Sequence, residues 1–402
     1  MQKNKIASTH LFSSATVTLL SMIFSVFIFL IPILVVLILS VFTVNKIIKI
    51  DLTEMRYPEI DGLRGYLAFF VFLHHAYIWQ IFLKTSTWKD PESNLFNQFG
   101  ETSVVFFFII TVFLFTTKLF KNKTGEIDWL NYLKSRFFRL FPMYFFFVII
   151  IFIIVGVLTQ FTVKVPFIEN LKSIISWLFF NVSKKSSDLN GLKDTFIINS
   201  GIAWTLPYEW TFYFLVPLIA LWFKIKVNLK AVLSFTFAAA IIMVLNKSSL
   251  RHFTPFLGGI IVALIMNMKK TEAIFKQKKY TILALLLLGV SVYFFNGGKK
   301  PIQIIISSLV FLIIASGNSF FGILSSAFSR KFGQITYSLY LLHGIFLFIL
   351  FHFVVGLERA KTLTHLEFWM IVTVSILPLL FICQLTFKYI ESPLMSFSKT
   401  KK

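Results

Sequence analysis

Residues 62–83 read GLRGYLAFFVFLHHAYIWQIFL, a run long enough to cross a bilayer in which Arg64, His74 and His75 are the only basic side chains. A helix needs about 20 predominantly apolar residues to span the hydrocarbon core of a membrane. Ionisable groups inside such a run are costly and usually functional. The run therefore predicts a transmembrane helix that carries part of a functional site.

Comparable apolar runs recur along the chain. Hydrophobic residues make up 57% of the sequence and charged residues only 14%, whereas about a quarter of a typical soluble domain is charged. We expect an all-α, polytopic integral membrane bundle of about 10–11 transmembrane helices, embedded in the lipid bilayer. The candidate spans are 15–44, 62–83, 101–120, 140–159, 202–224, 229–246, 252–269, 280–296, 301–317, 335–355 and 367–389.

The positive charge predicts orientation rather than a nucleic-acid partner. The formal net charge is +22, but Lys and Arg lie mainly in the gaps between the apolar runs. Alternating spans put the basic gaps 118–139, 224–230 and 269–279 on one side, which the positive-inside rule makes cytoplasmic. We expect a cytoplasmic C-terminus and, for a bacterial chain, the inner (plasma) membrane.

Three regions are predicted: an N-terminal segment 1–56 with an extra long apolar helix, a membrane-embedded core 57–394, and a basic cytoplasmic tail 395–402. Residues 15–44 fit a tilted spanning helix, a re-entrant segment or a removed targeting segment, and the sequence leaves these open. An amphipathic piece around Ile174 to Phe180 predicts a short interfacial helix or part of a lid.

Arg64 and His75 are predicted to share one helix face. Eleven residues at about 100° each make roughly three turns plus 20°, and the two lie about 16 Å apart along the axis. Glu209, within 204-WTLPYEWTFY-213, comes at a similar depth in its own span. A carboxylate beside an imidazole predicts a general-base pair of Glu209 and His75. The alternative is that Glu209 neutralises a buried arginine or lies among the headgroups. His74 points elsewhere, which favours packing or a supporting hydrogen bond.

Two further sites carry candidate residues. Arg136 and Arg139 are three residues apart, so one helix face presents two guanidiniums able to hold phosphate, although without further context ordinary positive-inside charge is the favoured explanation. His343 lies about 12 Å into its span by helical rise. His343 either donates a hydrogen bond to a reacting group or is a hydrogen-bonded histidine that serves packing. His352 is predicted to be interfacial, and Glu391 structural.

Other chemistries find no support in the sequence. The single cysteine, Cys383, excludes an internal disulfide and a cysteine-built metal site. Walker loops, dinucleotide fingerprints, zinc-protease motifs and nucleophile elbows are missing. We therefore predict no metal site and no permanently bound cofactor.

Taken together, four segments and the closing Glu391-Ser-Pro393 resemble the membrane-bound acyltransferase family 3, whose members acylate sugars of surface polysaccharides and related glycans. The resemblance covers roughly residues 57–393. Its motifs are Asp61-Gly-Leu-Arg64 followed by His75, Arg136-Phe-Phe-Arg-Leu-Phe-Pro142, Trp204-Thr-Leu-Pro-Tyr-Glu-Trp-Thr-Phe-Tyr213, Tyr337-Ser-Leu-Tyr-Leu-Leu-His343 and Glu391-Ser-Pro393.

The sequence departs from that family at two places. Where the family usually has Phe-Phe-x-x-Ser-Gly-Phe, this chain has Phe107-Phe-Ile-Ile-Thr-Val-Phe113. Val112 removes a glycine that allows close helix approach, which is expected to alter the acyl-binding groove. Trp210 replaces a position that is frequently acidic, so the acceptor site is expected to differ.

The resemblance implies a reaction. Arg136, Arg139 and Arg64 would hold the phosphates of cytoplasmic acyl-CoA, by family habit acetyl-CoA. His75 would deprotonate an acceptor hydroxyl, Glu209 would orient His75, and His343 would donate to the oxyanion. The acceptor would be a surface or lipid-linked glycan. The alternatives are a transporter or flippase of a sugar or lipid-linked sugar, and a glycan polymerase or ligase. The oligomeric state is not determined by the sequence.

Overall fold

The computed structural model describes residues 29–48, 57–121, 127–180, 188–268 and 274–397. These residues form helices, and no β-strand occurs among them beyond an isolated bridge of Leu189 with Leu192. The long and medium helices are α2 Pro58–Thr85, α3 Asn94–Lys121, α4 Trp129–Leu158, α5 Phe167–Leu178, α6 Leu206–Trp222, α7 Leu229–Leu245, α8 Thr254–Met266, α10 Lys278–Phe294, α11 Pro301–Ala315, α13 Thr336–Ile349 and α15 His365–Thr386.

Shorter elements link these helices or extend them. They are the 3₁₀ helices Thr195–Asn199, Ile202–Thr205 and Leu250–Phe253, the helices α12 Ala327–Gln334, α14 Leu357–Thr362 and α16 Ser392–Phe397, and the π-helical turns Leu350–Val354 and Phe387–Glu391. The π-helical turns continue α13 and α15 without a break, so each spans farther than its α-helical part alone.

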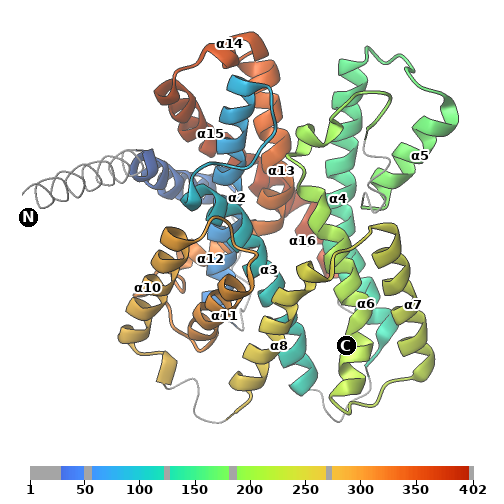
Figure 1. Cartoon of the computed structure of the whole chain (residues 1–402), viewed down its shortest axis with the longest axis vertical. Helices are drawn as coiled ribbons and strands as arrows, with labels where there is room; N and C mark the ends of the chain where they lie inside the picture. Colours follow the sequence, from blue (N-terminus) through green and yellow to red (C-terminus); the bar gives the residue numbers. More distant parts are fainter. Residues whose placement is uncertain (1–28, 49–56, 122–126, 181–187, 269–273, 398–402) are drawn as a thin grey trace, which may run out of the picture.

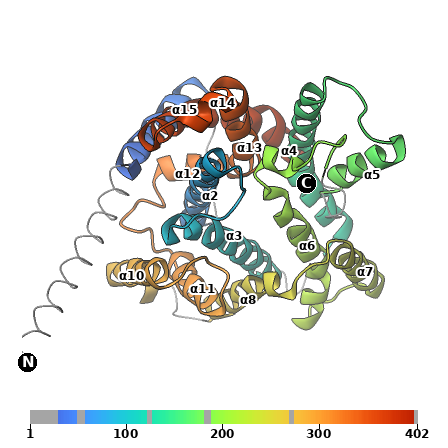
Figure 2. The same ribbon diagram turned by 45° about the horizontal axis from the view of Figure 1, so that its top comes forward.

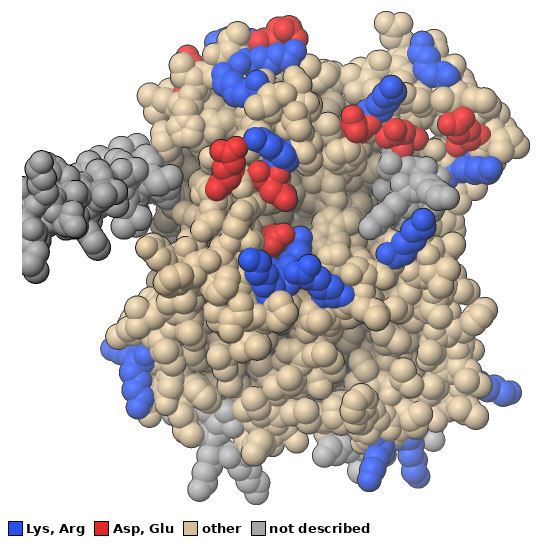
Figure 3. Space-filling view, in the orientation of Figure 1, with Lys and Arg blue, Asp and Glu red and all other residues tan. Residues whose placement is uncertain are grey.

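The predicted all-α membrane bundle is confirmed. Six described helices are long and apolar enough to cross a membrane, namely Phe29–Ile47, Pro58–Thr85, Asn94–Lys121, Trp129–Leu158, Thr336–Val354 and His365–Met395. Shorter apolar helices at Leu229–Leu245, Leu250–Met266 and Pro301–Ala315 complete the pattern. Apolar side chains midway along the outer helices are exposed, such as Leu286 at 62% and Val374 at 72%. Broad areas of the surface carry no charge (Figure 3), as lipid contact requires.

The helices gather around α2 and α3 (Figures 1 and 2). Helix α2 packs against α3, α12 and α13, while α3 packs against α8, and α6 against α7. Helices α8, α10 and α11 form one side of the bundle, and α4, α13 and α15 lie on another. A buried apolar cluster lies within each group, and α3 contributes side chains to both.

Local sequence sets where several helices begin. Asp128 caps α4 by accepting a hydrogen bond from the Asn131 backbone N–H at 3.0 Å. Thr364 and Glu367 form a capping box at the start of α15. Because α4 begins at Trp129, the basic pair of Arg136 and Arg139 lies inside a helix rather than in the gap that precedes the predicted span.

The N-terminal apolar helix packs on the core. Of the predicted range 15–44, residues 15–28 lie outside the described residues, and the helix runs Phe29–Ile47. One side is buried, including Ile33 and Val44, while Leu39 on another side is 59% exposed. The Gln384 amide donates to the Asn45 side chain at 2.9 Å, which joins this helix to α15.

The amphipathic piece predicted around Ile174 to Phe180 belongs to helix α5, which begins earlier, at Phe167. Trp177 is fully buried and its carbonyl accepts a hydrogen bond from the Tyr144 hydroxyl, whereas Phe167 is 74% exposed. Helix α5 therefore holds to α4 by one face and presents apolar side chains outward on the other, as an interfacial helix does.

Candidate active site

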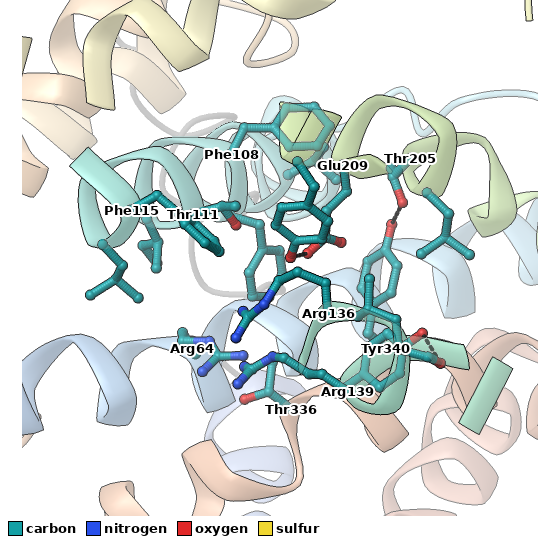
Figure 4. A pocket seen from close by; sticks show the side chains of 18 of the residues that line it. Arg64, Phe108, Thr111, Phe115, Arg136, Arg139, Thr205, Glu209, Thr336 and Tyr340 are labelled. Carbon is teal, nitrogen blue, oxygen red and sulfur yellow. Dashed lines mark hydrogen bonds between the residues drawn. The ribbon is translucent and has the colours of Figure 1, made fainter. Parts of the chain in front are cut away.

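A cavity of about 300 Å³ lies where α2, α3, α4, α6 and α13 meet. Figure 4 shows the side chains of 18 of the residues that line it. Among the described residues that line it, four are cationic and two are carboxylates. The charged lining residues are Asp61, Arg64, Lys118, Arg136, Arg139 and Glu209. We call it the arginine cavity.

Three guanidinium groups, from Arg64 on α2 and from Arg136 and Arg139 on α4, converge in this cavity (Figure 4). Arg64 forms an ion pair with Asp61 at 3.7 Å. The Arg136 guanidinium lies 5.0 Å from the Phe115 ring centre, and its buried Nε has no hydrogen-bond partner among the described residues. Converging cations with an unused donor are suited to an anion with several oxygens, such as phosphate.

Glycines place Arg64 in the cavity. A Cβ at Gly65 would lie 2.8 Å from the Phe332 carbonyl carbon, and one at Gly333 only 1.8 Å from the Asp61 carbonyl oxygen. Gly62 meets the Leu324 carbonyl in the same way. Helices α2 and α12 therefore approach backbone to backbone. The glycines on either side of Arg64 allow this contact because they have no Cβ to collide with the neighbouring backbone.

The opposite wall of the cavity is apolar and belongs to α3. It is formed by Val104, Phe107, Phe108, Ile110, Leu114 and Phe115, with Thr111 among them. Val112, the other unusual residue of this motif, points away and is fully buried. A Cβ on Gly259 of α8 would lie 2.9 Å from the Val112 Cβ, so the close approach of these helices rests on a glycine of α8. The motif residue that changes the cavity surface is Thr111.

The histidines His75 and His343 lie in direct contact. His343 Nε2 is 3.0 Å from His75 Nδ1, and each ring also places its Nδ1 3.0 Å from the carbonyl four residues earlier, Val71 or Leu339. A carbonyl only accepts, so both Nδ1 atoms carry the hydrogen. His343 then offers the lone pair of Nε2 to His75, and the lone pair of His75 Nε2 is not used in this contact.

The arginine cavity ends close to this histidine pair. Tyr340 lines the cavity, its hydroxyl hydrogen-bonds the Thr205 hydroxyl at 2.9 Å, and its ring centre lies 6.1 Å from that of His343. His74 turns away from the cavity and bonds the Phe96 carbonyl at 2.8 Å. This position fits the supporting role that its direction on the helix predicts.

Glu209 lies in the arginine cavity, where it accepts a hydrogen bond from the Tyr213 hydroxyl. No hydrogen bond joins Glu209 to His75 within the described ranges. The contact that the sequence hypothesis assigned to Glu209 is made by His343. The sequence hypothesis rested only on the similar estimated depths of Glu209 and His75 in the membrane. Two residues at equal depth do not have to lie on neighbouring helices.

Sequence reasoning missed several lining residues. Lys118, Tyr213, Thr336 and Tyr340 all face the cavity. Spacing would have found Tyr213, which is four residues after Glu209 and so shares its helix face. Glu391 is buried, with the Ser338 hydroxyl as its hydrogen-bond donor, as a structural residue would be. Within the described part of the chain, no group of three His, Cys, Asp or Glu residues could hold a metal ion.

The family model described as an acyltransferase domain matches residues 57–388. The chain belongs to this acyltransferase family, family 3. The match includes every residue of the arginine cavity and the histidine pair. No curated protein and no solved structure matches the chain. The protein is thus a membrane acyltransferase that transfers groups other than aminoacyl groups, and the resemblance seen in the sequence is confirmed.

Proposed function

We propose that this acyltransferase moves an acyl group, by default acetyl, from cytoplasmic acyl-CoA to a hydroxyl of a surface or lipid-linked glycan. The observation that carries the proposal is the convergence of three guanidiniums in one cavity whose lining residue Tyr340 lies beside His343, the hydrogen-bond partner of His75. Acyl-CoA combines phosphates with a long, mainly apolar arm. The cavity offers cations on α2 and α4 and an apolar wall on α3.

The donor would lie along α2. Arg64, Arg136 and Arg139 would hold the CoA phosphates. Arg64 and His75 are separated by about 16 Å of helix, a distance that the extended pantetheine arm covers. The thioester then lies near the histidine pair, past Tyr340.

The chemistry follows from the free nitrogen of His75. His75 Nε2 removes the proton of the acceptor hydroxyl as its oxygen attacks the thioester carbonyl carbon. The carbon–sulfur bond breaks, and the CoA thiolate takes the proton back from the imidazolium. General-base catalysis of this kind is worth about 10²–10⁴-fold. His343 stabilises the imidazolium by accepting a stronger hydrogen bond from His75 Nδ1.

In this proposal Glu209 takes the alternative role that the sequence left open, which is to neutralise buried arginines. Its carboxylate opposes the charge of the arginine cluster, together with Asp61, and Tyr213 holds it in place. Glu209 would thus act on donor binding rather than on the base.

The first test uses purified protein with radiolabelled acetyl-CoA and glycan extracted from the host surface. Wild type should release CoA and place base-labile label in the glycan. Arg64→Ala and His75→Ala should do neither. The controls Arg359→Ala, exposed on α14, and His352→Ala, outside the cavity, should remain active.

A transporter or flippase is the alternative function, and it predicts substrate movement without CoA release. If acetyl-CoA and longer acyl-CoA donors all fail with wild type, acyl transfer from CoA is contradicted and transport takes its place. Full transfer by His75→Ala would instead remove His75 from the mechanism.

A further inference from the structure

Lys118 is the one exposed side chain of the arginine cavity among the described residues. The other described residues that line the cavity are buried or half-buried. Lys118 lies one turn before α3 ends at Lys121, and it forms no ion pair within the part of the chain that the structure describes. The cavity therefore opens at this end of α3, and a cation that no described carboxylate neutralises stands at its mouth.

The groups that line the cavity follow a definite order along α3. The Arg136 guanidinium lies 5.0 Å from the centre of the Phe115 ring, and the Tyr340 ring centre lies 5.8 Å from that of Phe107. By helical rise, Lys118 is about 5 Å beyond Phe115 and about 16 Å beyond Phe107. From the mouth inwards, the cavity therefore presents Lys118, then the arginine guanidiniums, and then Tyr340.

Acyl-CoA carries its chemical groups in a matching order. The thioester is followed by the pantetheine arm, then by the diphosphate, and finally by a ribose that bears a separate 3′-phosphate. Ligand pockets usually measure about 300–1,000 Å³, and the arginine cavity, at about 300 Å³, is at the small end of this range. It does not enclose the whole of so long a molecule. With the thioester inside, the ribose and its 3′-phosphate lie at the mouth.

The positive charge at the mouth is not neutralised by the carboxylates of the described lining. Asp61 pairs with Arg64 at 3.7 Å, and Glu209 accepts a hydrogen bond from a tyrosine hydroxyl. Lys118 is close enough to Arg136 for the two positive charges to repel each other. A phosphate beside Lys118 would relieve this repulsion, whereas a neutral hydroxyl at the same place on the ribose would not.

We propose that Lys118 contacts the 3′-phosphate of the acyl-CoA donor. The enzyme thereby selects CoA over donors that lack this phosphate, such as acyl-dephospho-CoA and the phosphopantetheine arm of an acyl carrier protein. This inference rests on the proposed function and adds a residue that determines specificity for the donor. The phosphate of an anionic lipid headgroup offers the same chemistry to a lysine near the end of a span, and binding measurements with each ligand distinguish the two.

Binding of CoA and of 3′-dephospho-CoA to the purified full-length protein in detergent tests the proposal, because the two probes differ only in this phosphate. We expect wild type to bind CoA about tenfold more tightly than dephospho-CoA. This is the low end for a hydrogen bond to a charged group, since Lys118 is exposed to water. Lys118→Gln should weaken CoA binding about tenfold and leave dephospho-CoA binding unchanged. Lys118→Arg should keep the preference, because a guanidinium also binds phosphate.

The matched control is Lys121→Gln, which removes an exposed lysine of the same helix outside the cavity. This variant should keep the preference for CoA. Steady-state kinetics with acetyl-CoA give a second readout: Lys118→Gln should raise the KM and leave kcat unchanged, because the 3′-phosphate is far from the reacting carbonyl. Thermal unfolding checks that the fold of each variant is intact.

Three results would overturn the inference. They are equal binding of CoA and dephospho-CoA by wild type, a preference for CoA that survives in Lys118→Gln, and an equal loss of preference in Lys118→Gln and Lys121→Gln, which would indicate a general field rather than a contact. Equal binding of the two nucleotides, together with binding of short-chain phosphatidylglycerol that is lost in Lys118→Gln, would assign Lys118 to a lipid phosphate.

Failure of this inference and failure of the proposed function give different results. An enzyme that labels its glycan from acetyl-CoA and from acetyl-dephospho-CoA equally well keeps its acyl transfer and loses only the selection by Lys118. A protein that binds neither nucleotide and releases no CoA contradicts both.

Discussion

The contact between His75 and His343 gives a prediction at the scale of single residues. His343→Ala removes the acceptor for His75 Nδ1–H, so we expect kcat to fall about tenfold to a hundredfold while the KM for acyl-CoA stays unchanged. His343→Gln should recover part of the loss, because the amide oxygen can accept the same hydrogen bond. Steady-state kinetics with His352→Ala as control measures both. A Gln variant as poor as Ala would indicate packing alone.

Glu209 distinguishes the cavity seen in the structure from the pair predicted by the sequence. Glu209→Gln keeps an acceptor for the Tyr213 hydroxyl but removes one of two carboxylates facing four cations. We expect the KM for acyl-CoA to fall or hold and kcat to change less than about tenfold, since phosphate binding gains from the added positive charge. A kcat as low as that of His75→Ala, with unchanged KM, would restore the pairing of Glu209 with His75.

The sequence predicted which residues belong to the site better than it predicted which of them contact one another. Arg64, Arg136 and Arg139 stood out as ionisable groups in or beside apolar runs, and they do converge. The contact of His75 with His343 joins helices separated by most of the chain, so neither spacing nor depth reveals it. Lys118 resembled any basic residue at the cytoplasmic end of a span, and only the packing of α3 against α2 and α4 shows that it faces the cavity.

At the scale of elements, the packing of α2 on α12 carries a stability prediction. Gly333→Ala forces a methyl group against the Asp61 carbonyl. We expect a loss of about 1–3 kcal/mol or more in stability, as overpacking typically costs. A weaker affinity for acyl-CoA should accompany it, because the shift displaces Arg64. Thermal unfolding and the KM for acyl-CoA report the two effects.

The matched control is Gly289→Ala, in the middle of α10. Nothing lies within 4 Å of a Cβ at this position, so the change should leave KM alone and raise stability by up to about 1 kcal/mol through helix propensity. Equal behaviour of the two variants would mean that close approach at Gly333 does not position Arg64.

Helix positions followed from the sequence better than helix ends did. Each predicted span contains an apolar helix where the chain is described. The apolar run does not show that α4 extends back to Trp129 or that α13 and α15 continue as π-helical turns. Those features depend on a capping aspartate and on packing against neighbouring helices.

For the whole molecule, orientation decides whether the arginine cavity lies at the cytoplasmic end, where acyl-CoA is available. The Phe120 and Phe223 ring centres are 4.8 Å apart, so the loop 223–228 lies at the same end as the arginine cavity. Trp204 and Tyr208 contact His252, so the loop 246–249 lies near the start of α6. Helix α7, about 26 Å long, separates the two loops.

Labelling of introduced cysteines tests this orientation. The one native cysteine, Cys383, is fully buried, so the unmodified chain should not react with a membrane-impermeant maleimide. In intact cells we expect Lys247→Cys to be labelled and Lys226→Cys to be labelled only after permeabilisation, because the basic loops belong inside. The opposite result would place the arginine cavity on the outer side, where acyl-CoA is not supplied, and would contradict the assignment of the donor to this cavity.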